Sequence, residues 1–174
     1  MNPEYTMRPA KADDYKYCYR LTKRNMADLF TRHWGGWVPS KFREELVVDA
    51  VSIIVLGGRR AGYLSVKRRQ EGLYIDNIQL SPPLHGRGIG TSILSRLLAD
   101  HPGESVALTT FSDNPAKRLY ERLGFRVAGR EGNTLKMARH SNNSAITANS
   151  TPSLKPKDRA DPFPPVADPR SCRR

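Results

Sequence analysis

Cysteine is scarce in this sequence, and long apolar runs are absent. Only Cys18 and Cys172 occur among 174 residues, which excludes a disulfide-stapled scaffold, and we expect both to be free thiols. No run of about 18 apolar residues exists, and residues 1–10 are polar and charged, so we expect neither a membrane span nor a secretory signal. These absences favour a cytoplasmic location.

Sequence patterns for a metal centre are also missing. The four histidines are scattered without zinc-type spacing, at His33, His85, His101 and His140. A P-loop needs a lysine after its last glycine, and none follows Gly90. We therefore predict neither a bound metal nor a P-loop.

Acidic residues are outnumbered, with 17 Asp and Glu against 29 Lys and Arg, which gives a formal net charge of +12. Residues 140–174 hold six basic and three acidic residues, so 23 basic and 14 acidic residues remain in residues 1–139. A basic body suits a polyanionic cofactor and would also suit nucleic acid. We predict one folded domain over residues 1–139 and a disordered tail over 140–174, where Ser, Pro and scattered charge replace apolar residues.

The most informative stretch is residues 78–91, where an apolar strand runs into a double proline, a glycine-alternating turn and a helix. Gly86, Gly88 and Gly90 let the backbone approach a ligand closely, and their N–H groups can converge on an anion. The following helix adds unpaired N–H groups and a dipole that favours negative charge. We interpret this turn as a pyrophosphate site. It differs from a dinucleotide fingerprint, because Thr91 stands in place of the third glycine.

Periodicity predicts the order of helices and strands along the chain. The expected strands are 5–8, 51–56, 61–66, 73–80, 106–110, 125–128 and 134–137, and the expected helices are 13–33, 41–47, 89–98 and 115–123. For the last helix, Asn114 is predicted as the N-cap and Pro115 as the first residue. The prolines after Leu80 cannot donate to a ladder, so we expect the sheet to open there.

Two motifs resemble the GCN5-related N-acetyltransferase (GNAT) superfamily. The first is His85-Gly86-Arg87-Gly88-Ile89-Gly90, which is similar to the family's [Q/R]-x-x-G-x-G/A turn with histidine in the first place. The second, residues 114–125, resembles N-x-x-A-x-x-L-Y-x-x-x-G-F, with Ala116 one residue early. The resemblance covers about residues 4–139. It implies an α/β (α+β) fold, with a mixed, mostly antiparallel seven-stranded sheet, about four helices, and a splay between strands 4 and 5.

The resemblance also implies acetyl-CoA as the cofactor. In this family the strand before the turn lends main-chain groups to the pantetheine arm, and the turn holds the pyrophosphate. The residues that this assigns to the cofactor are Ile78, Gln79, Leu80, His85, Gly86, Arg87, Gly88, Ile89, Gly90, Thr91 and Asn114. Two of them have simpler explanations: Arg87 as an exposed loop residue and Asn114 as a helix cap.

Two residues are candidates for the proton transfers of such a reaction. Tyr120 matches the family tyrosine that donates a proton to the departing sulfur, and core packing is the alternative. Asp76 is the candidate general base, because a carboxylate among apolar neighbours has a raised pKa or is paired. It stands at the position of an aspartate seen in some aminoglycoside 6'-N-acetyltransferases. It could instead be structural, bonded to Tyr63, an arginine or the backbone, with Glu44, Glu45 or water as the base.

Both tryptophans fall in the stretch Trp34-Gly35-Gly36-Trp37. They either fill the bottom of the core or form a wall of the acceptor pocket, for which large rings on a flexible segment are suited. We predict that they bind the acceptor.

The resulting prediction is an acetyl-CoA-dependent N-acetyltransferase that acts on the primary amine of a small molecule. We expect no membrane partner and no nucleic acid partner, and a homodimer is left open. Two alternatives remain. The acceptor could be a protein N-terminus or lysine, or the chain could be a non-catalytic acyl-CoA-binding or nucleic-acid-associated module.

Overall fold

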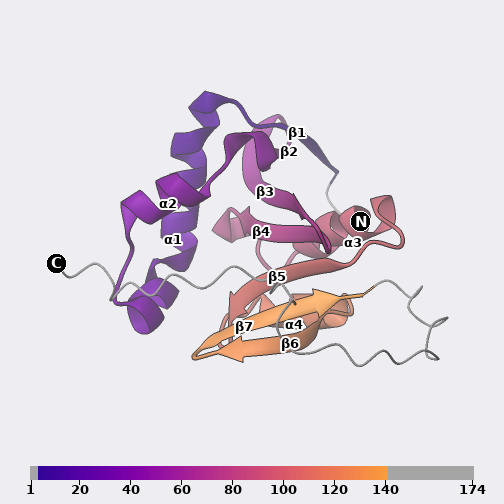
Figure 1. Ribbon diagram of the computed structural model, residues 1–174. Helices are drawn as coiled ribbons and strands as arrows, with labels where there is room; N and C mark the ends of the chain where they lie inside the picture. Colours follow the sequence, from indigo (N-terminus) through magenta and orange to yellow (C-terminus); the bar gives the residue numbers. More distant parts are fainter. Residues whose placement is uncertain (1–3, 141–174) are drawn as a thin grey trace, which may run out of the picture.

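Seven strands and four α-helices follow one another in the computed structural model, which describes residues 4–140 (Figure 1). The strands are β1 (Tyr5–Pro9), β2 (Val51–Leu56), β3 (Arg59–Arg69), β4 (Gly72–Leu80), β5 (Val106–Phe111), β6 (Arg126–Glu131) and β7 (Thr134–Arg139). The helices are α1 (Tyr15–Trp34), α2 (Pro39–Glu45), α3 (Ile89–Asp100) and α4 (Lys117–Arg122). The predicted tail lies outside the described residues except for His140, and so does Cys172. Cys18 is a buried free thiol, as predicted.

The strands form one sheet in the order β1-β2-β3-β4-β5-β7-β6. All neighbouring pairs are antiparallel except β4 and β5, which are parallel. That parallel pairing joins only Leu73–Ile75 to Val106–Leu108, although β4 continues to Leu80 and β5 to Phe111. The two strands therefore separate beyond this point, which confirms the predicted splay and fold class.

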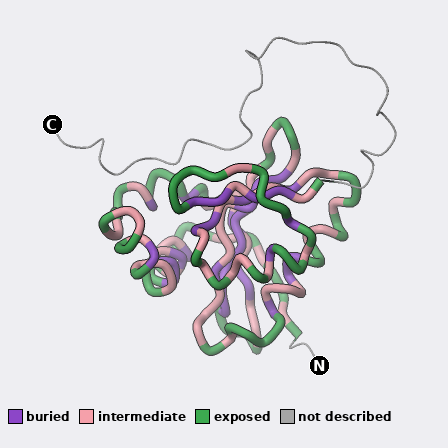
Figure 2. Tube along the Cα trace, turned by 90° about the horizontal axis from the view of Figure 1, so that it is seen from below, coloured by how far each residue is buried: buried purple, intermediate pink, exposed green. Residues whose placement is uncertain are grey.

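The helices cover both faces of the sheet (Figure 1). On one face, α1 and α2 pack against β2 and β3 through a cluster of Cys18, Leu21, Phe42, Leu46, Val51, Ile53 and Tyr63. On the other, α3 and α4 pack against β4, β5 and β7 through a larger cluster that includes Ile54, Ile75, Ile93, Leu94, Leu108, Tyr120, Phe125 and Met137. Consecutive strand residues point to opposite faces, so Ile53 and Ile54 belong to different clusters. Figure 2 shows these buried stretches along the central strands.

Two helix boundaries differ from the prediction. Helix α2 spans Pro39–Glu45 rather than 41–47, because Pro39 is well suited to the first helical position. Helix α4 starts at Lys117, two residues later than predicted. Asn114 still caps, since its Oδ1 accepts from the N–H of Ala116 at 3.0 Å, but it closes a tight turn that precedes the helix rather than the helix itself.

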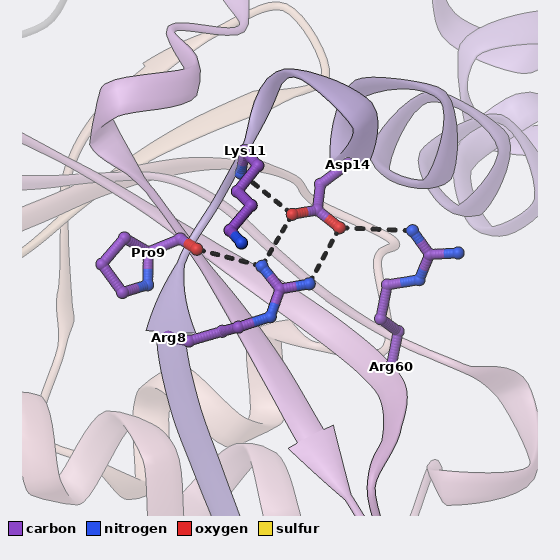
Figure 3. A network of polar contacts seen from close by, with 5 residues as sticks. All are labelled: Arg8, Pro9, Lys11, Asp14 and Arg60. Atoms are coloured by element: carbon purple, nitrogen blue, oxygen red, sulfur yellow. Dashed lines mark hydrogen bonds and ion pairs between the residues drawn. The ribbon is translucent and has the colours of Figure 1, made fainter.

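A buried carboxylate ties β1, β3 and the start of α1 together (Figure 3). The Asp14 side chain is 4% exposed and accepts from Arg8 at 2.7 and 3.0 Å, from Arg60 at 3.2 Å, and from the N–H of Lys11 at 2.9 Å. The hydrogen bond from Arg8 is the main reason why the pKa of Asp14 lies well below its ordinary value.

We expect Asp14→Asn to lower the free energy of unfolding by about 2 kcal/mol at pH 7, because two half-exposed arginines lose their shared partner. A lowered folded-state pKa gives stability that is present above the unfolded pKa of about 3.9 and is lost as the pH falls toward the folded value. The gap between variant and wild type should therefore narrow at pH 3. Urea unfolding at both pH values measures this. Asp28→Asn, at an exposed site on the same helix, should change stability by less than about 0.5 kcal/mol, and an equal loss in both variants would contradict the assignment.

Candidate active site

A cavity of about 1360 Å³ opens where β4 and β5 separate. Residues from α1, β4, the turn before α3, β5 and the region of α4 form its wall. The predicted site residues that line it are Trp34, Asp76, Ile78, Gln79, Leu80, His85, Gly86, Gly88, Gly90, Thr91, Asn114 and Tyr120. Arg87, Ile89 and Trp37 are described by the structure but do not line it.

A β-bulge in β4 helps to create this opening. Asn77 pairs with Ser65 of β3, and Ile75 pairs with Val66, so Asp76 between them has no partner residue. A bulge bends its strand and increases the local twist. It follows directly after Ile75, the last residue of β4 that pairs with β5. The bulge thus lies where the two strands begin to separate, and it carries the candidate base.

The end of β4 presents main-chain groups to the cavity in a defined alternation. The N–H of Ser81 donates to the carbonyl of Ala61 in β3 at 2.8 Å, so the main-chain groups of Ser81 point toward β3. Alternate residues of an antiparallel strand bond to opposite sides. Gln79 therefore also bonds toward β3, whereas the main-chain groups of Ile78 and Leu80 point toward the gap. Of the three predicted cofactor contacts on this strand, Gln79 has only its side chain available.

Side chains already bind the carbonyl of Leu80. It accepts from Asn25 Nδ2 at 2.9 Å and contacts His85 Nε2 at 2.8 Å. A carbonyl oxygen has two lone pairs, and both are used here. Leu80 can therefore offer a ligand its N–H but not its carbonyl. His85, the residue that departs from the family motif, has a structural partner in this turn.

The glycine turn has the geometry of an anion site. Gly86 and Gly88 adopt φ values of 72° and 78°, in the left-handed region that glycine occupies without strain. Gly88 is the N-cap of α3, and the first turn of this 12-residue helix holds no acidic residue. As at any helix start, the first N–H groups of α3 lack intrahelical partners. They lie at the positive end of the helix dipole. The side chain of Ile89 is buried in the core, so it can contribute only its main-chain N–H.

Tyr120 reaches the cavity from the side of α3 and α4. It is 7% exposed and packs edge-on against Phe125, with ring centroids 6.1 Å apart. Burial raises the pKa of Tyr120 to about 12. Within residues 4–140, its hydroxyl makes no hydrogen bond. The hydroxyl is thus a protonated donor that lines the cavity.

Asp76 is ion-paired rather than isolated. Its Oδ2 lies 3.0 Å from Nζ of Lys67, and the two side chains are 20% and 27% exposed. Lys67 also donates to the main-chain oxygen of Glu45 at 3.0 Å. The pKa of Glu45 is raised, first by loss of hydration and then by the charge of Asp76. Two carboxylates and one lysine therefore line the same corner of the cavity.

The two tryptophans have separate positions. Trp34 lines the cavity and packs against Phe111, with ring centroids 4.7 Å apart, and against Phe30 at 5.0 Å. Trp37 lies in the α1–α2 cluster, where its Nε1 donates to the Tyr19 hydroxyl at 3.1 Å. The left-handed Gly35 ends α1 between them, so the chain reverses before Trp37. Of the two tryptophans, only Trp34 lines the cavity.

Several residues that line the cavity were not predicted from the sequence. They include Asn25, Phe30, Lys67, Tyr74, Thr109 and Phe111. In the sequence, Asn25 and Phe30 are ordinary positions of the predicted first helix, and Phe111 directly follows the predicted strand 106–110. Lys67 begins a run of three basic residues, but a charged run does not tell where each side chain points.

Among residues 4–140, no three His, Cys, Asp or Glu side chains are grouped so as to hold a metal ion. None of the helices in that range has the length and apolar character needed to cross a membrane.

Residues 16–125 match the sequence model of the acetyltransferase (GNAT) family. Among curated proteins, a GCN5-like protein acetyltransferase of Mycobacterium tuberculosis is 37% identical over 79 residues. This match covers 41% of the chain and 38% of that relative, so the chain spans less than half the length of the relative.

Solved structures of acetyltransferases share the fold. The PaiA N-acetyltransferase of Thermoplasma acidophilum, in complex with coenzyme A, has a TM-score of 0.62 at 13% identity and covers 79% of this chain and 99% of its own. An acetyltransferase of Thermus thermophilus has a TM-score of 0.62 at 21% identity, covering 80% and 98%. The ribosomal-protein-S18-alanine N-acetyltransferase of Escherichia coli has a TM-score of 0.59 at 19% identity, covering 78% and 92%.

Proposed function

Because this chain belongs to the acetyltransferase (GNAT) family and is an acyltransferase, we propose that it transfers an acetyl group from acetyl-CoA to the primary amine of a small molecule. The observation that carries the proposal is the cavity between β4 and β5, which joins the unpaired edge of β4 to the N-terminus of α3. A long, polyanionic thioester needs this combination. The coenzyme A complex of a structural neighbour supports the same ligand class.

The residues of the cavity fit acetyl-CoA along its length. The N–H groups at the start of α3 and the glycine turn would hold the diphosphate. The main-chain groups of Ile78 and the N–H of Leu80 would bind the pantetheine arm. When bound, acetyl-CoA supplies an activated acetyl thioester. Arg87, exposed and outside the cavity lining, is assigned at most a long-range electrostatic role.

The transfer needs one proton to leave the amine and one to reach the sulfur. The reaction joins the amine nitrogen to the acetyl carbon and breaks the carbon–sulfur bond. We assign Asp76 to accept the amine proton and Tyr120 to donate to the sulfur, since they line the gap from its two sides. Main-chain N–H groups at the end of β4 would stabilise the oxyanion that forms between these steps.

A protein acceptor is the second candidate. The curated relative is named a protein acetyltransferase, and the cavity of about 1360 Å³ has room for the end of a peptide. The aromatic wall around Trp34 favours the small molecule, because it lines one end of the cavity with apolar rings. Thiol release from acetyl-CoA, measured with a panel of amines and of peptides, decides between them.

Acetyl-CoA should raise the melting temperature of the protein. A ligand bound only by the folded state stabilises it by about 2.7 kcal/mol at a hundredfold excess over Kd, which shifts the Tm of a domain of this size by several degrees. We expect Gly86→Ala to lose most of this shift, because its Cβ enters the space where the anion would bind.

Gly103→Ala is the matched control for this experiment. Both glycines have positive φ values, 72° and 91°, and a Cβ at either position meets nothing within 4 Å. Both variants therefore bear the same kind of backbone strain, but Gly103 lies at the far end of α3. A full acetyl-CoA shift in Gly86→Ala, or no shift in the wild type at millimolar ligand, would refute the turn assignment.

A further inference from the structure

Three side-chain amides form a hydrogen-bonded chain along the α1 side of β4. Asn25 Nδ2 donates to the carbonyl of Leu80 and to Oε1 of Gln79, both at 2.9 Å. Gln79 Nε2 in turn donates to Oδ1 of Asn77 at 2.8 Å. All three amides line the cavity, and Gln79 is only 7% exposed. None of these contacts is needed to close the sheet.

The carbonyl of Leu80, at one end of this row of hydrogen-bonded amides, determines the orientation of each amide. The carbonyl of Leu80 can only accept, so Asn25 must present its NH₂ group there. Gln79 must then present oxygen to Asn25 and nitrogen to Asn77, and Asn77 must present oxygen to Gln79. The NH₂ group of Asn77 is left as the free end. No residue within 4–140 accepts a hydrogen bond from this NH₂ group.

Asn77 lies in the half of the cavity where an acceptor would bind. It shares a face of the sheet with Gln79, which contacts α1 through Asn25, whereas Tyr120 belongs to the cluster on the opposite face. The residue that precedes Asn77 is the bulge residue Asp76. This half of the cavity thus offers a carboxylate and a hydrogen-bond donor on adjacent residues.

An aromatic wall completes the same half. Phe30, Trp34 and Phe111 all line the cavity and contact one another, with ring centroids 4.7 to 5.8 Å apart. Rings in such edge-to-face and tilted contacts form a rigid apolar surface for another ring or an aliphatic side chain. An acceptor that satisfies all three features carries an amine, an oxygen on a neighbouring carbon, and an apolar side chain.

We propose that Asn77, oriented by Gln79 and Asn25, is the specificity-determining residue that donates to the carbonyl oxygen of an α-amino amide acceptor. The inference rests on the proposed function and narrows its substrate class. An α-amino amide is the chemistry shared by a free amino-acid amide and by the first residue of a peptide. With the amine directed at Asp76, the carbonyl lies next to the Asn77 NH₂ group and an aromatic side chain lies against Trp34.

The test compares two acceptors that differ only in the carboxamide: phenylalaninamide and phenethylamine. With each rate expressed per concentration of unprotonated amine, we expect the wild type to favour phenylalaninamide by roughly tenfold in kcat/KM, the value of one or two hydrogen bonds. In Asn77→Asp, the side chain keeps its shape but turns an oxygen toward the carbonyl. The preference should disappear in that variant, and the loss should lie in KM, because the contact is the same in the ground and transition states.

Two further variants separate recognition from structure. Gln79→Met has similar volume but leaves Asn77 free to rotate, so the preference should fall only about threefold. Asn133→Asp is the control, because Asn133 lies in the β6–β7 turn, contacts His33 and does not line the cavity. It should keep the wild-type preference. Should Asn77→Asp not fold, as judged by its melting curve, Asn77→Ala carries the same test.

Each outcome has a defined meaning. An unchanged acceptor ratio in both Asn77 variants overturns the inference. So does a wild type that acetylates other primary amines but neither member of the pair, and in that case the proposed function stands. Failure with every amine and every peptide removes the proposed function as well. A peptide that begins with phenylalanine tells the two sources apart, since a lower KM than that of phenylalaninamide identifies a protein acceptor.

Discussion

Tyr120→Phe is expected to lower kcat about a hundredfold while the affinity for acetyl-CoA stays within about twofold. The hydroxyl lines the cavity and is kept protonated by burial, which raises the pKa of Tyr120 to about 12. A donor is needed at the moment when negative charge develops on the departing sulfur, and not before. Its removal therefore destabilises the transition state but not the bound cofactor.

The matched control is Tyr74→Phe. Tyr74 is also buried and also lines the cavity, but its hydroxyl donates to Oγ1 of Thr109 at 3.0 Å. Its loss should reduce kcat by less than about threefold and should lower the Tm through the broken hydrogen bond. Tyr120→Phe should leave the Tm unchanged, because the Tyr120 hydroxyl makes no hydrogen bond within residues 4–140. A Tyr120→Phe enzyme with normal kcat would reduce this residue to a packing role.

The fold was predictable because its signals are local. Alternation in the strands, the stripe of Ile93, Leu94 and Leu97 in α3, and glycine and proline at the boundaries are each read within a short window. The position of the splay was predicted wrongly, because β4 and β5 separate directly after Ile75, at the bulge, and not at the prolines that follow Leu80. The start of α4 was missed because an asparagine can cap a turn as well as a helix, and its side chain bonds in the same way in both.

The two halves of the site differed in how far they could be predicted. The half that would hold the cofactor lies in one continuous stretch, from Ile78 to Thr91, so its motif carries most of the information. The other half combines Asn25 with Gln79 and Trp34 with Phe111, pairs that are far apart along the chain. No periodicity reports which side chains of distant elements meet. Trp37 illustrates this, because adjacency to Trp34 in sequence did not place it in the cavity.

Asp76→Asn is expected to lower kcat at least thirtyfold near neutral pH. A general base must be ionised before it can accept the amine proton, and asparagine can neither ionise nor accept a full proton. The change also leaves Lys67 without the partner that lies 3.0 Å away. Rates with a fixed amine near neutral pH measure the loss.

Two companion variants decide what the loss means. Lys67→Met breaks the same ion pair but keeps the carboxylate, so it should retain a pH-dependent rate within about tenfold of the wild type if Asp76 is the base. Glu45→Gln tests the neighbouring carboxyl, whose pKa is raised by loss of hydration and by Asp76. Its place beside Asp76 and Lys67 makes Glu45 a rival base. If Glu45→Gln lowers kcat at least thirtyfold and Asp76→Asn does not, Glu45 takes the role, and Asp76 serves to hold Lys67 in the acceptor half of the cavity.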